Sequence, residues 1–218
     1  MTTSAKQPTP ATILLLATLL LTACQTPEAA NDPTASPRLS SAARTPLATT
    51  RTTGKLTPVA TFPQHAPSGV AATDGRVFVT FPRWDPGMPY TVAEIVDGQP
   101  IPYPNQTTNE VDRENPAEHL LSVESITVGP DGGLWILDSG RPDFEETISG
   151  GAKLVRVDLE TDRITRTIVL PDAVARPNSY LAGLRVDGRH GAEGVAVAAD
   201  SSPSGFNGLV VVDLASGE

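Results

Sequence analysis

Residues 124–138 read ESITVGPDGGLWILD, two short apolar runs on either side of a Gly-Pro-Asp-Gly-Gly turn. Runs of this length, bounded by Gly, Pro and Asp, are typical of two strands joined as a hairpin. The pattern recurs in residues 68–80, SGVAATDGRVFVT, and in residues 182–200, AGLRVDGRHGAEGVAVAAD. The sequence therefore predicts three copies of one hairpin. Three apolar residues occupy equivalent positions in the copies: Phe78, Trp135 and Val197.

A second kind of segment follows each hairpin. It reads TVAEIVDG at 91–98, LVRVDLETD at 154–162 and LVVVDLASG at 209–217, with Asp97, Asp158 and Asp213 in corresponding places. In the second copy, residues 164–170 (ITRTIVL) add a fourth strand. Four antiparallel strands in roughly 55–60 residues, repeated around an axis, are typical of a β-propeller blade with long loops. A β-sandwich also has many short strands, but it does not explain two interleaved motifs in register.

The number of repeats is too small for a closed ring. Three first hairpins are present, and the third copy reaches residue 218 before a fourth strand. Propellers close with about four to eight blades, and an open arc exposes sheet edges. We therefore expect an all-β fold in which residues 56–218 form a partial β-propeller, truncated in its third blade. Missing C-terminal blades, or a separate partner half, are expected to close it.

The N-terminal segment has the pattern of a targeting signal. Residues 11–23 form one apolar run that spans about 20 Å as a helix, which is too short for the ~30 Å core of a bilayer. The run ends in Leu-Thr-Ala before Cys24, which resembles the lipobox of bacterial lipoproteins. Residues 1–23 are therefore predicted to be a signal peptide and Cys24 to be lipidated. An ordinary secretory signal with an incidental Cys is the alternative.

The segment after the predicted signal peptide and the overall composition add to the prediction of location and partners. Residues 24–55 are mostly Thr, Ala, Pro and Ser and are predicted to be a disordered tether. The protein is thus expected to be extracytoplasmic, either anchored in a membrane (facing the periplasm or the cell surface) or secreted. The net charge of −9 opposes binding to nucleic acid, and the single Cys excludes an internal disulfide framework and a multi-thiolate metal site. The predicted contact with the membrane is through the lipid on Cys24.

Five short motifs occur in order along the chain: VFVTFPRWDPGMPY at 77–90, PYPN at 102–105, LWILDSG at 134–140, KLVRVD at 153–158 and SYL at 179–181. Together they resemble the major royal jelly protein/yellow family, from about Pro58 to the last residue. The resemblance implies a secreted, six-bladed β-propeller with a ligand pocket at the mouth of its central channel. It also implies one of several roles: dopachrome-type conversion, binding of biogenic amines, or a nutritional or sterol-binding role.

The innermost strand of each propeller blade lines the channel, so candidate site residues lie at the start of each hairpin. The equivalent pairs are Ser68/Gly69, Glu124/Ser125 and Ala182/Gly183. Glu124 is the one carboxylate among them. It is either a cation ligand or general base, or a solvated charge in the channel. Ser125 beside it is a candidate ligand-binding residue.

Further candidates come from the flanking loops. Asn178 and Tyr180 precede the third hairpin, and Arg83 and Trp84 follow the second strand of the first. Arg83 and Trp84 are expected to form a cation–π pair that either walls a ligand or clamps two blades. Asp138 and Asp200 end equivalent strands, and each is expected to accept hydrogen bonds from backbone N–H groups of the loop that follows, as in an Asx-turn.

Two functions from different classes fit these residues. The first is a binding protein that captures a small cationic or aromatic ligand, without a cofactor. The second is an enzyme, either a quinone tautomerase or a lactonase-like hydrolase. Propellers of the sugar-lactonase type, which the fold resembles, use a divalent cation. Related proteins often carry Asn-Asp where this chain has Ala182-Gly183, which weighs against such a metal site.

Overall fold

The computed structural model describes residues 54–84, 86–203 and 207–218. Within these ranges the chain forms eleven strands and two short 3₁₀ helices, and no α-helix. The predicted signal peptide, Cys24 and residues 25–53 of the predicted tether lie outside the described residues. Among the described residues, no helix has the length and hydropathy needed to cross a bilayer.

The strands form three antiparallel sheets, each in chain order. The first sheet contains β1 (Gly69–Thr73), β2 (Arg76–Thr80), β3 (Val92–Val96) and β4 (Gln99–Pro102). The second contains β5 (Val123–Val128), β6 (Leu134–Asp138), β7 (Lys153–Asp158) and β8 (Arg163–Val169). The third contains β9 (Leu181–Asp187), β10 (Val195–Asp200) and β11 (Gly208–Asp213). The 3₁₀ helices are η1 (Thr107–Asn109) and η2 (Pro142–Phe144).

The pairing registers confirm that the three hairpins are equivalent. Phe78 lies opposite Ala71, Trp135 opposite Thr127 and Val197 opposite Arg185, which are corresponding places in the three sheets. In each hairpin, the equivalent residues therefore lie on the same face of the sheet. Phe78 and Trp135 both point toward the sheet that follows in the chain.

The third strand of each sheet shows that one of the three aspartates was misaligned in the sequence comparison. Glu94, Arg156 and Val211 lie opposite the three equivalent residues of the second strands. Asp158 and Asp213 come two residues later, whereas Asp97 comes three residues later and is out of register by one. The reason is the tight Asp97-Gly98 turn, in which both residues have positive φ, joining β3 directly to β4.

Strand β4 was not expected from its sequence, Gln-Pro-Ile-Pro. Proline lacks the N–H that a central strand needs, so two prolines argue against a strand unless it lies at an edge. β4 is the outer strand of the first sheet and pairs with β3 alone. Its position at the edge therefore explains why the prolines are tolerated.

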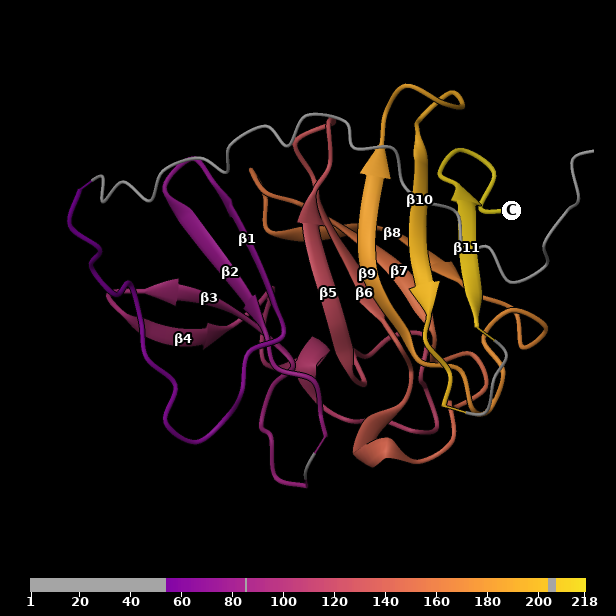
Figure 1. Ribbon diagram of the computed structural model, residues 1–218, viewed down its shortest axis with the longest axis horizontal. Helices are drawn as coiled ribbons and strands as arrows, with labels where there is room; N and C mark the ends of the chain where they lie inside the picture. Colours follow the sequence, from indigo (N-terminus) through magenta and orange to yellow (C-terminus); the bar gives the residue numbers. More distant parts are fainter. Residues whose placement is uncertain (1–53, 85, 204–206) are drawn as a thin grey trace, which may run out of the picture. The chain divides into compact units, whose positions relative to one another are not determined.

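The three sheets pack face to face with their first strands innermost. Figure 1 shows β1, β5 and β9 next to one another, and contacts join β1 to β5 and β5 to β9. The other strands of each sheet follow outward in order. This arrangement of repeated antiparallel sheets confirms an all-β fold of the β-propeller type with three blades among the described residues. A total of six blades stays a prediction.

Apolar side chains fill both seams between the sheets. The seam between the first and second sheets buries, among others, Phe78, Val92, Ile126, Leu134 and Ile136. The seam between the second and third buries, among others, Trp135, Leu154, Leu181, Leu184 and Ala196. Burying one large aliphatic side chain stabilises a fold by about 1.5–3 kcal/mol. The middle sheet is thus covered on both faces.

Two buried carboxylates fix the chain where it enters the inner strands. Asp138, at the end of β6, accepts hydrogen bonds from the N–H groups of Leu121, Ser122 and Gly140 at 2.7–2.9 Å. It also pairs with the buried Lys153 ammonium at 2.7 Å. These bonds confirm the structural role predicted for Asp138 and anchor the segment that leads into β5.

Asp200 has the same role in the third sheet. Its carboxylate accepts the Tyr180 N–H at 2.8 Å and the Ser179 hydroxyl at 2.7 Å, just before β9. The N–H that Asp200 binds belongs to the segment before β9 and not to the loop after β10, for which the bond was predicted. The bond holds the backbone of Tyr180 where the inner strand begins.

We expect Lys153→Met to lower the free energy of unfolding by about 3–5 kcal/mol, because it leaves the Asp138 carboxylate buried without its cation. Arg156→Met is the matched control. Arg156 pairs with Asp131 at 2.5 Å, where both groups are partly exposed and such a pair contributes at most about 1 kcal/mol. Urea unfolding followed by tryptophan fluorescence measures both variants. Equal losses for the two would contradict a special role for the Lys153–Asp138 pair.

Candidate functional site

A cavity of about 410 Å³ opens where the inner strands of the three sheets meet. Its lining comes from all three first hairpins and two loops: Ser68, Gly69, Val70, Trp84, Glu124, Ser125, Ile126, Tyr180, Ala182, Gly183 and Arg185. A Cβ at Gly69 would lie 2.8 Å from the hydroxyl oxygen of Thr80 on the neighbouring strand β2, so glycine leaves room for that side chain, whereas the Ile126 nitrogen of β5, at 3.5 Å, would be in ordinary van der Waals contact. Residues of all three predicted inner-strand pairs are thus among those that line this cavity.

A β-bulge in β5 positions the carboxyl group of Glu124. Val123 pairs with Asp138 and Ser125 with Leu137, so Glu124 is an extra residue with no counterpart on β6. Bulges bend a strand locally and re-aim a side chain, and they are common beside functional sites. Here the bulge follows directly after the segment that Asp138 anchors.

The Glu124 carboxyl is buried and only half satisfied. Its Oε2 accepts a hydrogen bond from the Tyr180 hydroxyl at 3.0 Å, whereas its buried Oε1 has no hydrogen-bond partner. Burial raises the pKa of Glu124 to about 7, although the hydrogen bond from Tyr180 acts in the opposite direction. An ionised Glu124 thus lacks a cation or a second donor, and this missing partner points to a ligand group.

An aromatic wall stands beside this carboxyl. The Trp84 indole N–H donates to the Tyr180 hydroxyl oxygen at 3.2 Å, which in turn donates to Glu124. Burial and the neighbouring Glu124 raise the pKa of Tyr180 to about 12, so the phenol stays a donor at neutral pH. The exposed ring of Phe144 stacks on Trp84 at 6.2 Å and on Tyr180 at 6.5 Å between ring centroids.

Phe144 was missed from the sequence because nothing in the loop motif Pro-Asp-Phe-Glu-Glu marks it. In the structure Asp143 and Phe144 have φ values of 59° and 53°, which non-glycine residues adopt at a cost of about 1–3 kcal/mol each. Arg141 compensates by donating to the carbonyls of Phe144 and Glu145. Arg113 holds the loop from outside through ion pairs with Asp143 and Glu145.

Arg83 does not line the cavity. Its buried guanidinium donates to the backbone carbonyls of Met88, Asn109, Leu120 and Leu121, and burial lowers the pKa of Arg83. These bonds tie the loop after β2 to the segment that enters β5. Of the two expected roles, Arg83 therefore has that of a clamp between blades.

The expected stacking of Arg83 on Trp84 is wrong. Among the described residues, cation–π contacts are made by Arg76, whose guanidinium lies 4.9 Å from the Phe78 ring centroid and 5.4 Å from that of Tyr103. The Arg83 guanidinium instead donates hydrogen bonds to backbone carbonyls, and Trp84 stacks on Phe144.

The other predicted residues divide between the cavity and the scaffold. Trp84, Glu124, Ser125 and Tyr180 come together at the cavity. Ser125 also accepts the Leu184 N–H at 3.1 Å and so joins β5 to β9. Asn178 is not among the lining residues, and its carbonyl accepts a hydrogen bond from Arg141.

The cavity contains one carboxylate, and the described part of the chain holds no group of three or more His, Cys, Asp and Glu residues that could bind a metal. A divalent cation at Glu124 therefore stays a prediction. Without a metal, a carboxyl with a pKa near 7, hydrogen-bonded to a phenol, can accept a ligand's donor group or exchange a proton at neutral pH.

Comparison with known proteins identifies relatives of the chain. Residues 121–218 match the family model described as major royal jelly protein, and three of the five sequence motifs lie within these residues. Protein yellow from Drosophila erecta and from Drosophila melanogaster are each 36% identical to this chain over 135 residues. The alignments cover 57% of this chain and 25% of each relative, so the chain spans about a quarter of the curated proteins it matches.

A solved structure described as a streptogramin B lyase structure is 15% identical to this chain with a TM-score of 0.36. The superposition covers 71% of this chain and 43% of the other. A likeness this distant does not bear on function. The sequence resemblance to the major royal jelly protein/yellow family, by contrast, is confirmed.

The raised pKa of Glu124 makes stability depend on pH. The carboxyl titrates near 4.5 in the unfolded chain and near 7 in the folded protein, so the folded state binds more protons between these values. The stabilising contribution of the protonated form is therefore complete below about pH 4.5 and is lost as the pH rises through 7.

Glu124→Gln cannot ionise, so we expect the native protein to lose up to about 3 kcal/mol relative to this variant between pH 4 and pH 8. Urea unfolding of both proteins across this range measures the difference, in which the titration of all other groups cancels. A difference that does not change with pH would contradict the raised pKa.

Proposed function

We propose that this chain, which residues 121–218 place in the major royal jelly protein/yellow family, binds a small ligand at the mouth of its channel. The observation that supports this proposal most directly is the unpartnered, buried Oε1 of Glu124 in a cavity with an aromatic wall. Buried polar groups in folded proteins are nearly always satisfied, and the exceptions mark functional sites. The cavity volume of about 410 Å³ lies in the range of small-molecule pockets.

The same groups suggest the class of ligand. An ionised Glu124 gains most from a protonated amine or another strong donor, because such charge-assisted hydrogen bonds are the strongest ones available. The faces of Trp84, Phe144 and Tyr180 attract planar rings and cations. We therefore propose a small cationic or aromatic ligand, and no cofactor.

An enzymatic role is the alternative, and the pKa of Glu124 favours it. A carboxyl that titrates near pH 7 is suited to remove a proton from a substrate and to return it elsewhere. A quinone tautomerase needs such a transfer and no oxidant, and a hydrolase of the lactonase type needs a base to activate water. Tyr180 would orient the carboxyl in either reaction.

Location forms the second part of the proposal. The apolar run at residues 11–23 and the Leu-Thr-Ala-Cys sequence that ends at Cys24 support a lipid-anchored, extracytoplasmic protein. A tether of Thr, Ala, Pro and Ser would then hold the propeller away from the membrane.

We expect small aromatic amines to bind, and Glu124→Gln to weaken their binding by about 10–100-fold, because the variant removes a charge-assisted hydrogen bond. Isothermal titration calorimetry with a panel of aromatic amines, phenols and sugars measures this. Glu118→Gln is the matched control, since it removes an exposed carboxylate outside the cavity and should leave affinity unchanged.

Analysis of the same compounds after incubation with the protein distinguishes binding from catalysis. Ligand recovered unchanged after incubation with the native protein supports binding alone. Conversion that disappears in Glu124→Gln and persists in Glu118→Gln supports the enzymatic alternative. Neither binding nor conversion of any compound in the panel would contradict both functions.

For the anchor, we expect cells that express the chain to attach radiolabelled fatty acid to it, and we expect Cys24→Ala to abolish the label. Phase separation in a detergent should move the native chain, but not the variant, into the detergent phase. Label that survives Cys24→Ala would rule out lipidation at this residue.

A further inference from the structure

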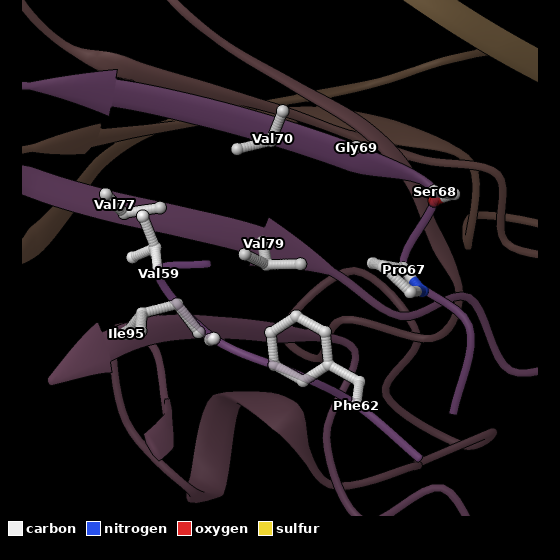
Figure 2. A pocket seen from close by; sticks show the side chains of 10 residues that line it. Val59, Phe62, Pro67, Ser68, Gly69, Val70, Val77, Val79 and Ile95 are labelled. Atoms are coloured by element: carbon white, nitrogen blue, oxygen red, sulfur yellow. The ribbon is translucent and has the colours of Figure 1, made fainter. Parts of the chain in front are cut away.

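Two further pockets of the structure differ in character. Figure 2 shows a groove of about 340 Å³ on the outer face of the first sheet, lined almost entirely by apolar side chains such as Val70, Val79 and Phe62. The structure does not show what covers this groove. A cleft of about 420 Å³ lies instead in the seam between the second and third sheets, and most of its walls are polar. It shares no lining residue with the channel cavity.

Both walls of this second pocket, the seam cleft, come from consecutive sheets that the structure describes. They consist of the β5–β6 turn, strands β6, β7 and β8, and the loop between β9 and β10. The lining residues are Asp131, Trp135, Arg156, Thr165, Arg166 and Glu193. The cleft is thus formed entirely between residues 131 and 193, at a distance in sequence from both ends of the described chain.

The equivalent place in the first seam, between the first and second sheets, is filled by one side chain. The Arg76 guanidinium lies 4.9 Å from the centroid of the Phe78 ring and donates two hydrogen bonds to Glu94, at 2.7 and 2.8 Å. It also reaches across the seam to the Leu159 carbonyl and to Asp162, both at 2.9 Å. Arg76 thus closes the first seam over the aromatic ring.

The second seam has no such closure, because two of these positions hold different residues. Trp135 is equivalent to Phe78, so Gly133 stands in the place of Arg76 and Arg156 in the place of Glu94. Gly133 has no side chain to lay over the indole. A Cβ there would lie 2.7 Å from the Arg156 Nε, so glycine leaves room for that guanidinium. The open space beside Trp135 is the seam cleft.

Two ion pairs give the seam cleft polar walls without a net charge. The Arg156 Nε donates to Asp131 at 2.5 Å, and the Arg166 guanidinium donates to Glu193 at 2.6 Å. All four groups are partly exposed. Two positive and two negative charges cancel, so the cleft as a whole attracts neither an anion nor a cation. It does offer strong donors and strong acceptors side by side.

Trp135 adds an apolar surface with one unused donor. The residue is 3% exposed, and its indole N–H has no hydrogen-bond partner among the residues that the structure describes. Buried polar groups are nearly always satisfied, and the exceptions need an explanation such as an absent ligand. The equivalent Phe78 carries no N–H, so this unused donor belongs to the open seam alone.

We propose that the seam cleft binds an uncharged sugar unit. Each sugar hydroxyl both donates and accepts, so one ring can donate to the two carboxylates while it accepts from the two guanidinium groups and the indole. The C–H face of the ring suits the apolar part of Trp135. A charged ligand would meet like charge on one side of the cleft. The volume lies in the range of small-molecule pockets, and the proposal does not depend on any ligand of the channel cavity.

Tryptophan fluorescence of the full chain, in a non-ionic detergent, tests the proposal. The chain has two tryptophans, so Trp84→Phe leaves Trp135 as the only one. In this variant we expect at least one of glucose, galactose, mannose, fucose and N-acetylglucosamine to change the emission along a saturating curve. The dissociation constant should be about 1–10 mM, which is typical of a ligand with roughly a dozen non-hydrogen atoms. No saturable change with any of the five at about 100 mM would overturn the proposal.

Variants of the ion pairs show whether the sugar occupies this cleft. Arg166→Gln and Glu193→Gln, each combined with Trp84→Phe, should weaken binding by at least about 10-fold, because each removes a charge-assisted hydrogen bond. Both side chains are partly exposed, so the fold should be little affected. Arg163→Gln, on the same strand but outside the lining, is the matched control and should leave the affinity unchanged. Equal affinity in all three variants would place the sugar elsewhere and overturn the proposal.

A double variant closes the cleft by copying the first seam. Gly133→Arg with Arg156→Glu reproduces the pair formed by Arg76 and Glu94, and we expect it to abolish the response of Trp135 to sugar while the far-UV circular dichroism stays that of the native chain. Native affinity in this variant would contradict the proposed position. If the double variant does not fold, the two glutamine variants decide.

Charged analogues test the class of ligand. Glucose 6-phosphate and glucosamine carry opposite charges on the same ring, and neither should bind more tightly than glucose, because each meets a group of its own charge in the cleft. Affinity for either one more than about 10-fold above that for glucose would show a site for a charged ligand and would overturn the proposal of an uncharged sugar.

Discussion

The structure depends on one constraint, which is that a blade with apolar residues on both faces must be covered on both sides. The second sheet meets this requirement, and every residue of β6 is buried as a result. Its two seams contain nearly all of the large apolar side chains that are fully buried. The outer sheets meet the requirement on one side only, and their exposed apolar residues are the direct physical consequence.

The candidate site is a product of this packing. The inner strands of the three sheets contact one another, and the cavity lies between them. Asp138 and Asp200 then fix the chain at the entry to β5 and β9, which sets the positions of Glu124 and Tyr180. The carboxyl is buried by its neighbours, and that burial is the main cause of its raised pKa, to which the charge of Asp138 adds.

The sequence was sufficient to predict the features that depend on the regular spacing of apolar runs and turns. The hairpins, the equivalence of Phe78, Trp135 and Val197, and the channel position of Glu124 all follow from apolar runs between turns. It was insufficient where tertiary contacts decide the outcome. The donors of Arg83 find carbonyls in the loop after β2 and in the connection between β4 and β5. Phe144 stacks on Trp84 and Tyr180 through a backbone conformation that no local preference indicates. Strand β4 was hidden by prolines that only an edge position tolerates.

The bulge at Glu124 gives the site an unusual genetic property. Because β5 holds one residue more than β6 at this point, a single inserted or deleted codon separates a bulged strand from a regular one. The change would leave the alternation of the remaining side chains intact, since the rest of the ladder keeps its pairing. One residue in the chain thus separates a strand that carries this acidic group from a regular strand without it.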